Sequence, residues 1–142
     1  MTMQLTKNFK LEEFIKSDTA EEKGIDNTPN EEQLENIKWT ASQLQEIRYC
    51  YKHPMYITSG FRCEELNEAV NGSKTSAHKK GLAVDINQGS KVKNKHLFDL
   101  IRNLMKFGLP IDQLINEYDY SWIHIGFKSK GEEPRKQIFK IV

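Results

Sequence analysis

The stretch DQLINEYDYSWIHIGF, residues 112–127, decides the fold. Gln113–Tyr118 and Trp122–Phe127 both look like strands, with only a few residues between the two runs, and the second run has Ile123 and Ile125 at alternate positions. Alternation with a period of two is typical of β-strands, and a short connection usually joins antiparallel neighbours. The stretch therefore predicts an antiparallel hairpin.

The second run of this hairpin presents a histidine on one face. Trp122, His124 and Gly126 share that face, whereas Ile123 and Ile125 point to the other, where we expect the core. Gly126 leaves free space beside the imidazole, as an accessible site requires. His124 is therefore a candidate functional residue.

Most of the predicted helices lie upstream of the hairpin. We expect a short helix over Leu11–Ser17. A longer amphipathic helix begins at Thr28 with a capping box to Glu31 and runs to about Cys50. Two further helices are expected over 64–70 and around 97–104. The remaining predicted strands are Met55–Thr58, Leu82–Asn87 and a last edge strand, Lys136–Val142.

Helices that fall mostly early and strands that fall mostly late predict an α+β fold, with N-terminal helices packed on a small, mainly antiparallel sheet. A length of 142 residues suits one hydrophobic core. We therefore expect residues 1–142 to form a single domain.

Composition argues against several classes of protein. Lys and Arg total 21 against 20 for Asp and Glu, so the net charge of +1 gives no reason to expect a nucleic-acid partner. No apolar run predicts membrane insertion, and the N-terminus lacks the apolar segment of a secretory signal. We expect a monomer made in the cytoplasm, with Cys50 and Cys63 reduced. Basic residues gather at 91–95 and 128–140, which we interpret as solvated faces, or at most as a source of weak attraction to the anionic cell wall.

Two residues near the middle of the chain carry metal-binding chemistry. His78 lies in a loop, and Asp85 follows seven residues later in a predicted strand. A loop that turns back at Gly81 can bring both side chains to one point. Imidazole and carboxylate form the mixed ligand set of catalytic zinc, which takes three protein ligands, and His124 is the natural third. Manganese or another divalent ion remains open. We interpret the remaining histidines, His53 and His96, as structural or solvent-exposed.

Three segments together resemble a known family. SGFRCEELNEAVNG (59–72), SAHKKGLAVDIN (76–87) and DQLINEYDYSWIHIGF (112–127) are similar, in this order, to the M15 family of zinc D-Ala-D-Ala carboxypeptidases and related phage endolysins, especially its small single-domain members. The resemblance runs from about Pro54 to Phe127, with a weaker likeness near the N-terminus. It implies a hedgehog/DD-peptidase-like fold and peptidoglycan stem peptides as substrates.

Carried over residue by residue, the resemblance implies zinc ligands at His78, Asp85 and His124, and a substrate-carboxylate-binding arginine at Arg62. A guanidinium is a planar fork that suits a carboxylate. Without the motif, we would expect an arginine on a solvated turn, paired with an acid of the next helix. Ser76 either hydrogen-bonds within the metal loop or touches substrate.

The general base departs from the pattern of better-known members, in which an acidic residue lies three positions before the last histidine. That position holds Ser121, which cannot replace a carboxylate. Glu117 ends the preceding strand, and the hairpin can fold its carboxylate back beside His124. Asp119, in the predicted turn, is the second candidate. Trp122 either forms a wall of the cleft or packs half-buried in the core.

Two functions of different classes remain open. The first is a zinc peptidase that cleaves a peptidoglycan stem peptide or cross-bridge, as a D,D-carboxypeptidase or as an endopeptidase of the endolysin type. The second is a catalytically silent, zinc-stabilised module that binds the cell wall or a protein. For the enzyme we expect action on the cell wall after release during phage lysis, or as a virion-associated enzyme, ahead of a bacterial remodelling role.

Overall fold

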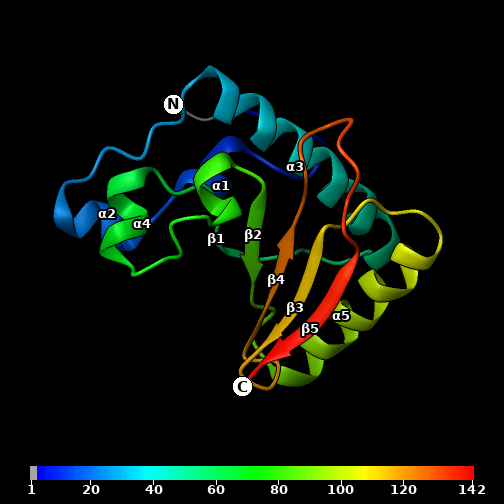
Figure 1. Ribbon diagram of the computed structural model, residues 1–142. Coiled ribbons are helices and arrows are strands. Elements are labelled where there is room, and N and C mark those ends of the chain that lie inside the picture. The colour runs from blue at the N-terminus through cyan, green and yellow to red at the C-terminus, as the bar shows by residue number, and fades with distance from the viewer. Residues whose placement is uncertain (1–2) are drawn as a thin grey trace.

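The computed structural model describes residues 3–142, in which a five-stranded sheet is combined with helices in an α+β arrangement (Figure 1). The spatial order of the strands is β1-β2-β4-β3-β5. The strands are β1 (Ile57–Ser59), β2 (Ala83–Ile86), β3 (Gln113–Glu117), β4 (Trp122–Gly126) and β5 (Gln137–Ile141). The helices are α1 (Leu11–Ile15), α2 (Asp18–Lys23), α3 (Glu31–Tyr51), α4 (Glu64–Ala69), the 3₁₀ helix η1 (Ala77–Lys80) and α5 (Lys91–Lys106).

The predicted hairpin is confirmed as the antiparallel pair β3 and β4. In its register Ile115 pairs with His124 and Glu117 with Trp122. On the other side of β4, Asp85 of β2 pairs with His124, also antiparallel. The sheet is thus mainly antiparallel, as predicted, and β5 is an edge strand that pairs with β3 in parallel.

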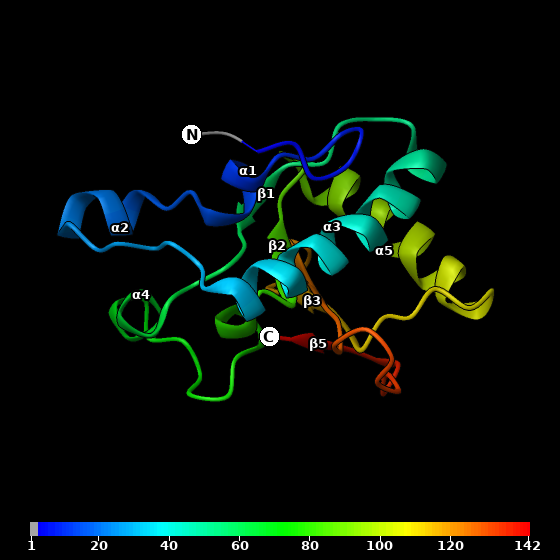
Figure 2. The same ribbon diagram turned by 90° about the horizontal axis from the view of Figure 1, so that it is seen from above.

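The hydrophobic core lies between the sheet and its two long helices. Figure 2 shows α3 and α5 side by side over one face of the sheet. Ile123 and Ile125 are fully buried on that face, as the alternation predicted. The opposite face of β2, β3 and β4 is free of long helices and carries the candidate site. No helix within residues 3–142 is long and apolar enough to cross a membrane.

The start of α3 differs from the prediction. Asn30, not Thr28, is the N-cap, and it exchanges side-chain hydrogen bonds with Gln33 in a capping box. The Thr28 hydroxyl instead donates a 2.6 Å hydrogen bond to Asp26. Because Thr28 is engaged in that turn, the helix begins at Glu31, where Asn30 satisfies the free backbone N–H groups.

Two short helices were not expected. Helix α2 has six residues and buries only Ala20, so it shows no apolar periodicity. Ser17 caps its start and Gly24 closes it. The second is η1, which turns a segment predicted as a loop into a single turn of 3₁₀ helix.

Gly81 connects η1 to β2 at the predicted reversal. Its φ of +79° lies in the left-handed region, and a Cβ there would come within 2.7 Å of Ile37 Cγ1 and 2.9 Å of the Gln33 carbonyl oxygen. Only glycine therefore lets the chain turn this close to α3. That turn fixes His78 relative to Asp85.

Asn27 ties the N-terminal helices to the segment that precedes α4. Its buried side-chain amide donates to the carbonyl oxygens of Ile15 and Phe61, at 2.9 and 3.0 Å, and accepts from the Cys63 N–H at 2.8 Å. The Phe61 N–H also donates to the Phe14 carbonyl oxygen. The N-terminal segment is thus fastened to the chain beside Arg62.

Candidate metal centre

His78 projects from η1 and is only 3% exposed. Its Nδ1 lies 2.7 Å from the carbonyl oxygen of Gly60, a group that can only accept a hydrogen bond. Nδ1 must therefore carry the proton, which leaves the lone pair of a neutral ring on Nε2. A backbone carbonyl that orients a histidine in this way is common behind metal ligands.

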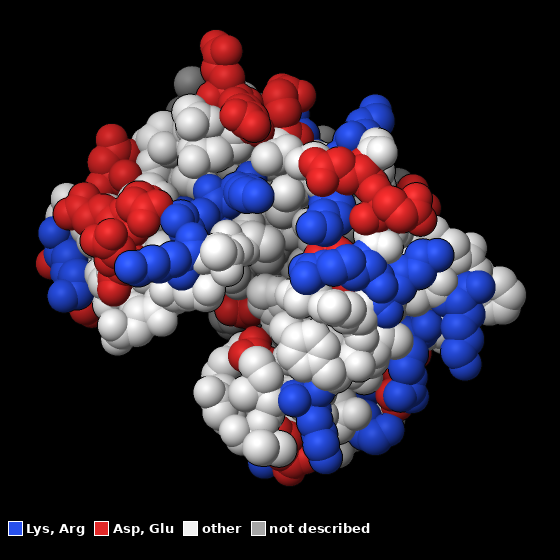
Figure 3. Space-filling model, viewed as in Figure 1, with Lys and Arg blue, Asp and Glu red and all other residues white. Residues whose placement is uncertain are grey.

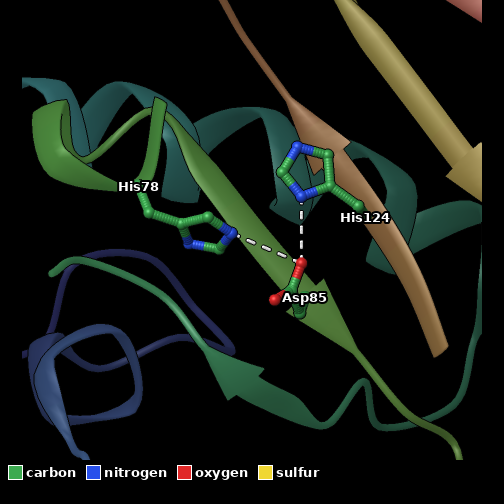
Figure 4. A group of neighbouring side chains, drawn as sticks. All are labelled: His78, Asp85 and His124. Carbon is green, nitrogen blue, oxygen red and sulfur yellow. Dashed lines mark hydrogen bonds and ion pairs between the residues drawn. The ribbon is translucent and has the colours of Figure 1, made fainter. Parts of the chain in front are cut away.

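Three side chains converge in front of the sheet (Figure 4). His78 Nε2 lies 3.4 Å from Asp85 Oδ1, and His124 Nδ1 lies 3.0 Å from the same oxygen. One ligand atom from each residue lies within 4.8 Å of the others. Two imidazole nitrogens and a carboxylate oxygen are a donor set that suits zinc with an open coordination position. The structure therefore brings together the three predicted ligands, and their chemistry fits the ion.

The Asp85 carboxyl is buried but strongly stabilised as an anion. Burial works to raise its pKa, but the hydrogen bonds and positive charges of the His124 and His78 rings in their protonated form outweigh that effect, and the pKa lies well below its ordinary value. Asp85 is therefore ionised at neutral pH, the state in which a carboxylate binds a cation.

Arg62 lies beside this cluster and not on a solvated turn. Its Nη2 lies 3.5 Å from Asp85 Oδ2, on the carboxylate oxygen that the histidines leave free. Ser59 accepts from Nε at 3.2 Å and Asn67 accepts from Nη1 at 3.3 Å. Of the two acids in the first turn of α4 that could have paired with it, Glu64 and Glu65, Glu64 pairs with Lys79 instead. The guanidinium is thus held in place on three sides.

Glu117 lies on the same face of the sheet as His124, as the hairpin predicted. Its Oε2 accepts a 2.8 Å hydrogen bond from the Trp122 indole N–H. Burial raises the pKa of Glu117, and the negative charge of Asp85 adds to that effect, while the bond from Trp122 opposes it. A carboxyl with a raised pKa beside a candidate metal centre is a candidate general base.

The neighbouring turn points its polar groups elsewhere. Asp119 has a side chain that is 82% exposed and lies 3.3 Å from Lys91 Nζ. The Ser121 hydroxyl donates to the Tyr118 carbonyl oxygen. Neither residue contacts the three converging side chains, which leaves Glu117 as the candidate carboxyl.

The other residues singled out in the sequence occupy distinct places. The Ser76 hydroxyl accepts from the His78 N–H at 3.2 Å and so supports the loop. Trp122 is half-buried, with its ring next to Tyr118. The histidines outside the cluster, His53 and His96, line a different pocket near the end of β2. Cys50 and Cys63 are free thiols.

Comparison with known proteins agrees with the site. The family model for peptidase M15 matches residues 7–126. The chain belongs to the M15 peptidase family. No curated protein matches it. The match begins well before Pro54, so the N-terminal helices of this M15 peptidase lie within the matched length and are not an appendage.

Sequence reasoning missed the groups that orient the site. The Gly60 carbonyl carries no side-chain signal, and its position next to His78 appears only in the fold. Asn67 belongs to a quoted motif, but nothing in its spacing predicts a bond to Arg62. The bond between Trp122 and Glu117 follows from the hairpin register, where the two residues are paired, and could have been found there.

Proposed function

We propose that this M15 peptidase is a zinc enzyme that hydrolyses a peptide bond in peptidoglycan stem peptides or cross-bridges. His78, Asp85 and His124 hold the metal. The observation that carries the proposal is the convergence of their three ligand atoms within 4.8 Å, beside a half-buried carboxyl and a fixed guanidinium.

Zinc, when bound, supplies a Lewis acid that polarises a carbonyl group and lowers the pKa of a coordinated water. The chain's own residues do the rest of the chemistry. Glu117 takes a proton at its carboxylate from the attacking water and gives it to the leaving amine. Trp122 holds that carboxylate and forms part of the wall beside it.

Arg62 has two roles at the site: it orients Asp85 and it binds a substrate carboxylate. Through Nη2 it fixes the second oxygen of Asp85, which keeps the carboxylate oriented towards the histidines. A guanidinium has five N–H groups, and the contacts with Asp85, Ser59 and Asn67 leave donors on Nη1 and Nη2 for a substrate carboxylate. Ser76 maintains the loop that carries His78.

The proposed substrate also determines where the enzyme acts. Residues 1–142 form one catalytic domain, which works as a monomer on the cell wall after release from the cell in phage lysis or from a virion. Stem peptides of the wall lie outside the cytoplasmic membrane, so the proposed substrate requires the enzyme to act on that side.

The decisive experiment compares Glu117→Gln with the unaltered, zinc-loaded protein on purified peptidoglycan. We expect the release of free amines to fall roughly 100-fold or more, because a positioned base contributes about that factor, while bound zinc per chain stays the same. Glu46→Gln, an exposed acid on α3, is the matched control and should retain full activity.

The same experiment tests the silent-module alternative. Wall binding without amine release, in every metal state of the unaltered protein, would replace the enzyme by a zinc-stabilised binding module. Where amines are released, mass spectrometry of the products identifies the bond. A free D-alanine indicates a carboxypeptidase, whereas larger fragments indicate an endopeptidase.

A further inference from the structure

A groove begins at His124, one side of the candidate metal centre, and continues well beyond it. A cavity of ≈ 490 Å³ runs from Glu117 and His124 along the sheet to Lys128 and Arg135, with Ser73 and Thr75 on its other side. Figure 3 shows this face hollowed between two lobes, with acidic atoms inside the hollow. The catalytic chemistry described above uses only one end of this groove.

The charged side chains at the end of the groove away from His124 leave a net positive charge. Arg135 binds Asp112 through its side chain, with Nη2 at 2.7 Å and Nε at 3.0 Å, and through its backbone N–H at 2.8 Å. That pair is electrically neutral and both oxygens of Asp112 are engaged. Lys128 therefore supplies one uncompensated positive charge at this end of the groove.

The Lys128 ammonium has no hydrogen-bond or ion-pair partner among residues 3–142, and it acts on Asp112 only through longer-range attraction. Its side chain is partly buried and faces the groove. A partly desolvated cation without a partner favours an anionic ligand. Lys128 also lies beyond residue 126, where the family match ends, so the match assigns it nothing.

The distance between His124 and Lys128 determines where along a bound peptide a group that contacts Lys128 would lie. Lys128 lies four positions after His124, two positions past the end of β4, and at about 3.3 Å per residue the two lie at most roughly 13 Å apart. An extended peptide has the same rise, and the lysine side chain shortens the gap. A carboxylate two or three residues from the bond being cut would therefore reach the ammonium.

We propose that Lys128 forms a subsite for a free carboxylate of the substrate peptide, so that the enzyme prefers acidic stem peptides to amidated ones. The hydroxyls of Ser73 and Thr75, which lie 3.1 Å apart on the facing wall, hydrogen-bond the peptide between this subsite and the metal. The inference rests on the proposed function and names the substrate class of that same site.

The test uses two synthetic stem pentapeptides that are identical except that the internal carboxylates are free in one and amidated in the other. Their hydrolysis is compared in zinc-loaded chains, and their binding is measured by calorimetry with zinc-loaded Glu117→Gln. We expect roughly five-fold preference for the acidic peptide, the equivalent of an ion pair at a partly exposed site, and loss of that preference in Lys128→Met. The preference should also decrease as salt is raised.

Lys130→Met is the matched control, because Lys130 is exposed and lies outside the groove lining; it should keep the preference. Cleavage with the same preference in Lys128→Met overturns the subsite but leaves the peptidase. Lys128-dependent binding without cleavage supports the subsite and refutes the peptidase. Neither binding nor cleavage of either peptide overturns both proposals.

Discussion

At the scale of single residues, the pair formed by Glu117 and Trp122 controls the pH range of the proposed chemistry. A general base acts when ionised, so activity is lost as pH falls through its pKa. Burial and the charge of Asp85 raise the pKa of Glu117, and the indole N–H of Trp122 counteracts them. The indole thus extends the active range towards lower pH.

Trp122→Phe removes that hydrogen bond and keeps an aromatic ring. Because the bond favours the ionised carboxylate, its loss raises the pKa of Glu117 further, and the acid limb of the kcat/KM profile should move to higher pH. Trp39→Phe is the control, since the indole of Trp39 donates to the Lys128 backbone carbonyl and not to a carboxylate. An acid limb that stays in place in Trp122→Phe would separate Glu117 from the chemistry.

At the scale of elements, the short segment from η1 to β2 determines whether the ligands meet. Gly81→Ala introduces a Cβ into α3 in addition to the conformational cost of a positive φ. We expect a loss of roughly 2–4 kcal/mol in the free energy of unfolding, the sum of about 1 kcal/mol for the backbone and 1–3 kcal/mol for overpacking.

Gly24→Ala separates these two costs. Gly24 has a φ of +66°, close to that of Gly81, but a Cβ there meets nothing within 4 Å. Urea unfolding of the two variants should therefore differ by the packing cost alone. Equal losses would show that contact with α3 does not constrain the turn.

The hairpin turn is a second strained element. Tyr118, Asp119 and Tyr120 all have positive φ, at 50°, 53° and 59°, a conformation that side chains disfavour. Asp119 is exposed, so Asp119→Gly relieves strain at the loss of only a surface ion pair with Lys91. We expect the midpoint of thermal unfolding to rise, by an amount equivalent to roughly 0.5 kcal/mol. A fall would mean that the aspartate supports the turn.

The local patterns of the sequence predicted most strands and the long helices, since alternation and 3.6-residue periodicity are properties of neighbouring residues. They placed the start of α3 wrongly, because Thr28 and Asn30 compete as caps and only the turn around Asp26 decides between them. Whether β5 pairs in parallel cannot be seen locally, because its partner β3 lies more than twenty residues away. The position of the Gly60 carbonyl behind His78 cannot be predicted locally either, because the two residues lie 18 positions apart in the chain.

At the scale of the whole molecule, the metal ligands come from η1, β2 and β4, so all three meet only in the folded chain. A ligand that binds the folded state alone stabilises it, by about 2.7 kcal/mol at a free concentration 100 times its Kd. Zinc should therefore raise the thermal midpoint, and a chelator should reverse the change. His124→Ala should abolish the zinc-dependent rise.

His96→Ala is the control for that measurement, because His96 is exposed on α5 and belongs to a different pocket. It should leave the zinc-dependent rise intact. A rise that survives His124→Ala would place the metal elsewhere. Such a result is unexpected, since among residues 3–142 the one group of three or more His, Cys, Asp or Glu side chains that could hold a metal ion is His78, Asp85 and His124.

The buried amide of Asn27 is a position where deamidation would damage the protein. Spontaneous deamidation turns asparagine into aspartate, which would set a carboxylate against the carbonyl oxygens of Ile15 and Phe61 where a donor stood. A buried group without a matching partner lowers the free energy of unfolding by about 1–3 kcal/mol or more. The loss of these hydrogen bonds would also loosen Arg62, which follows Phe61 in the chain. Asn27→Asp, compared with the exposed Asn71→Asp, should reproduce the aged protein as a chain with weakened zinc affinity. A chain that deamidates at this position would therefore lose zinc affinity.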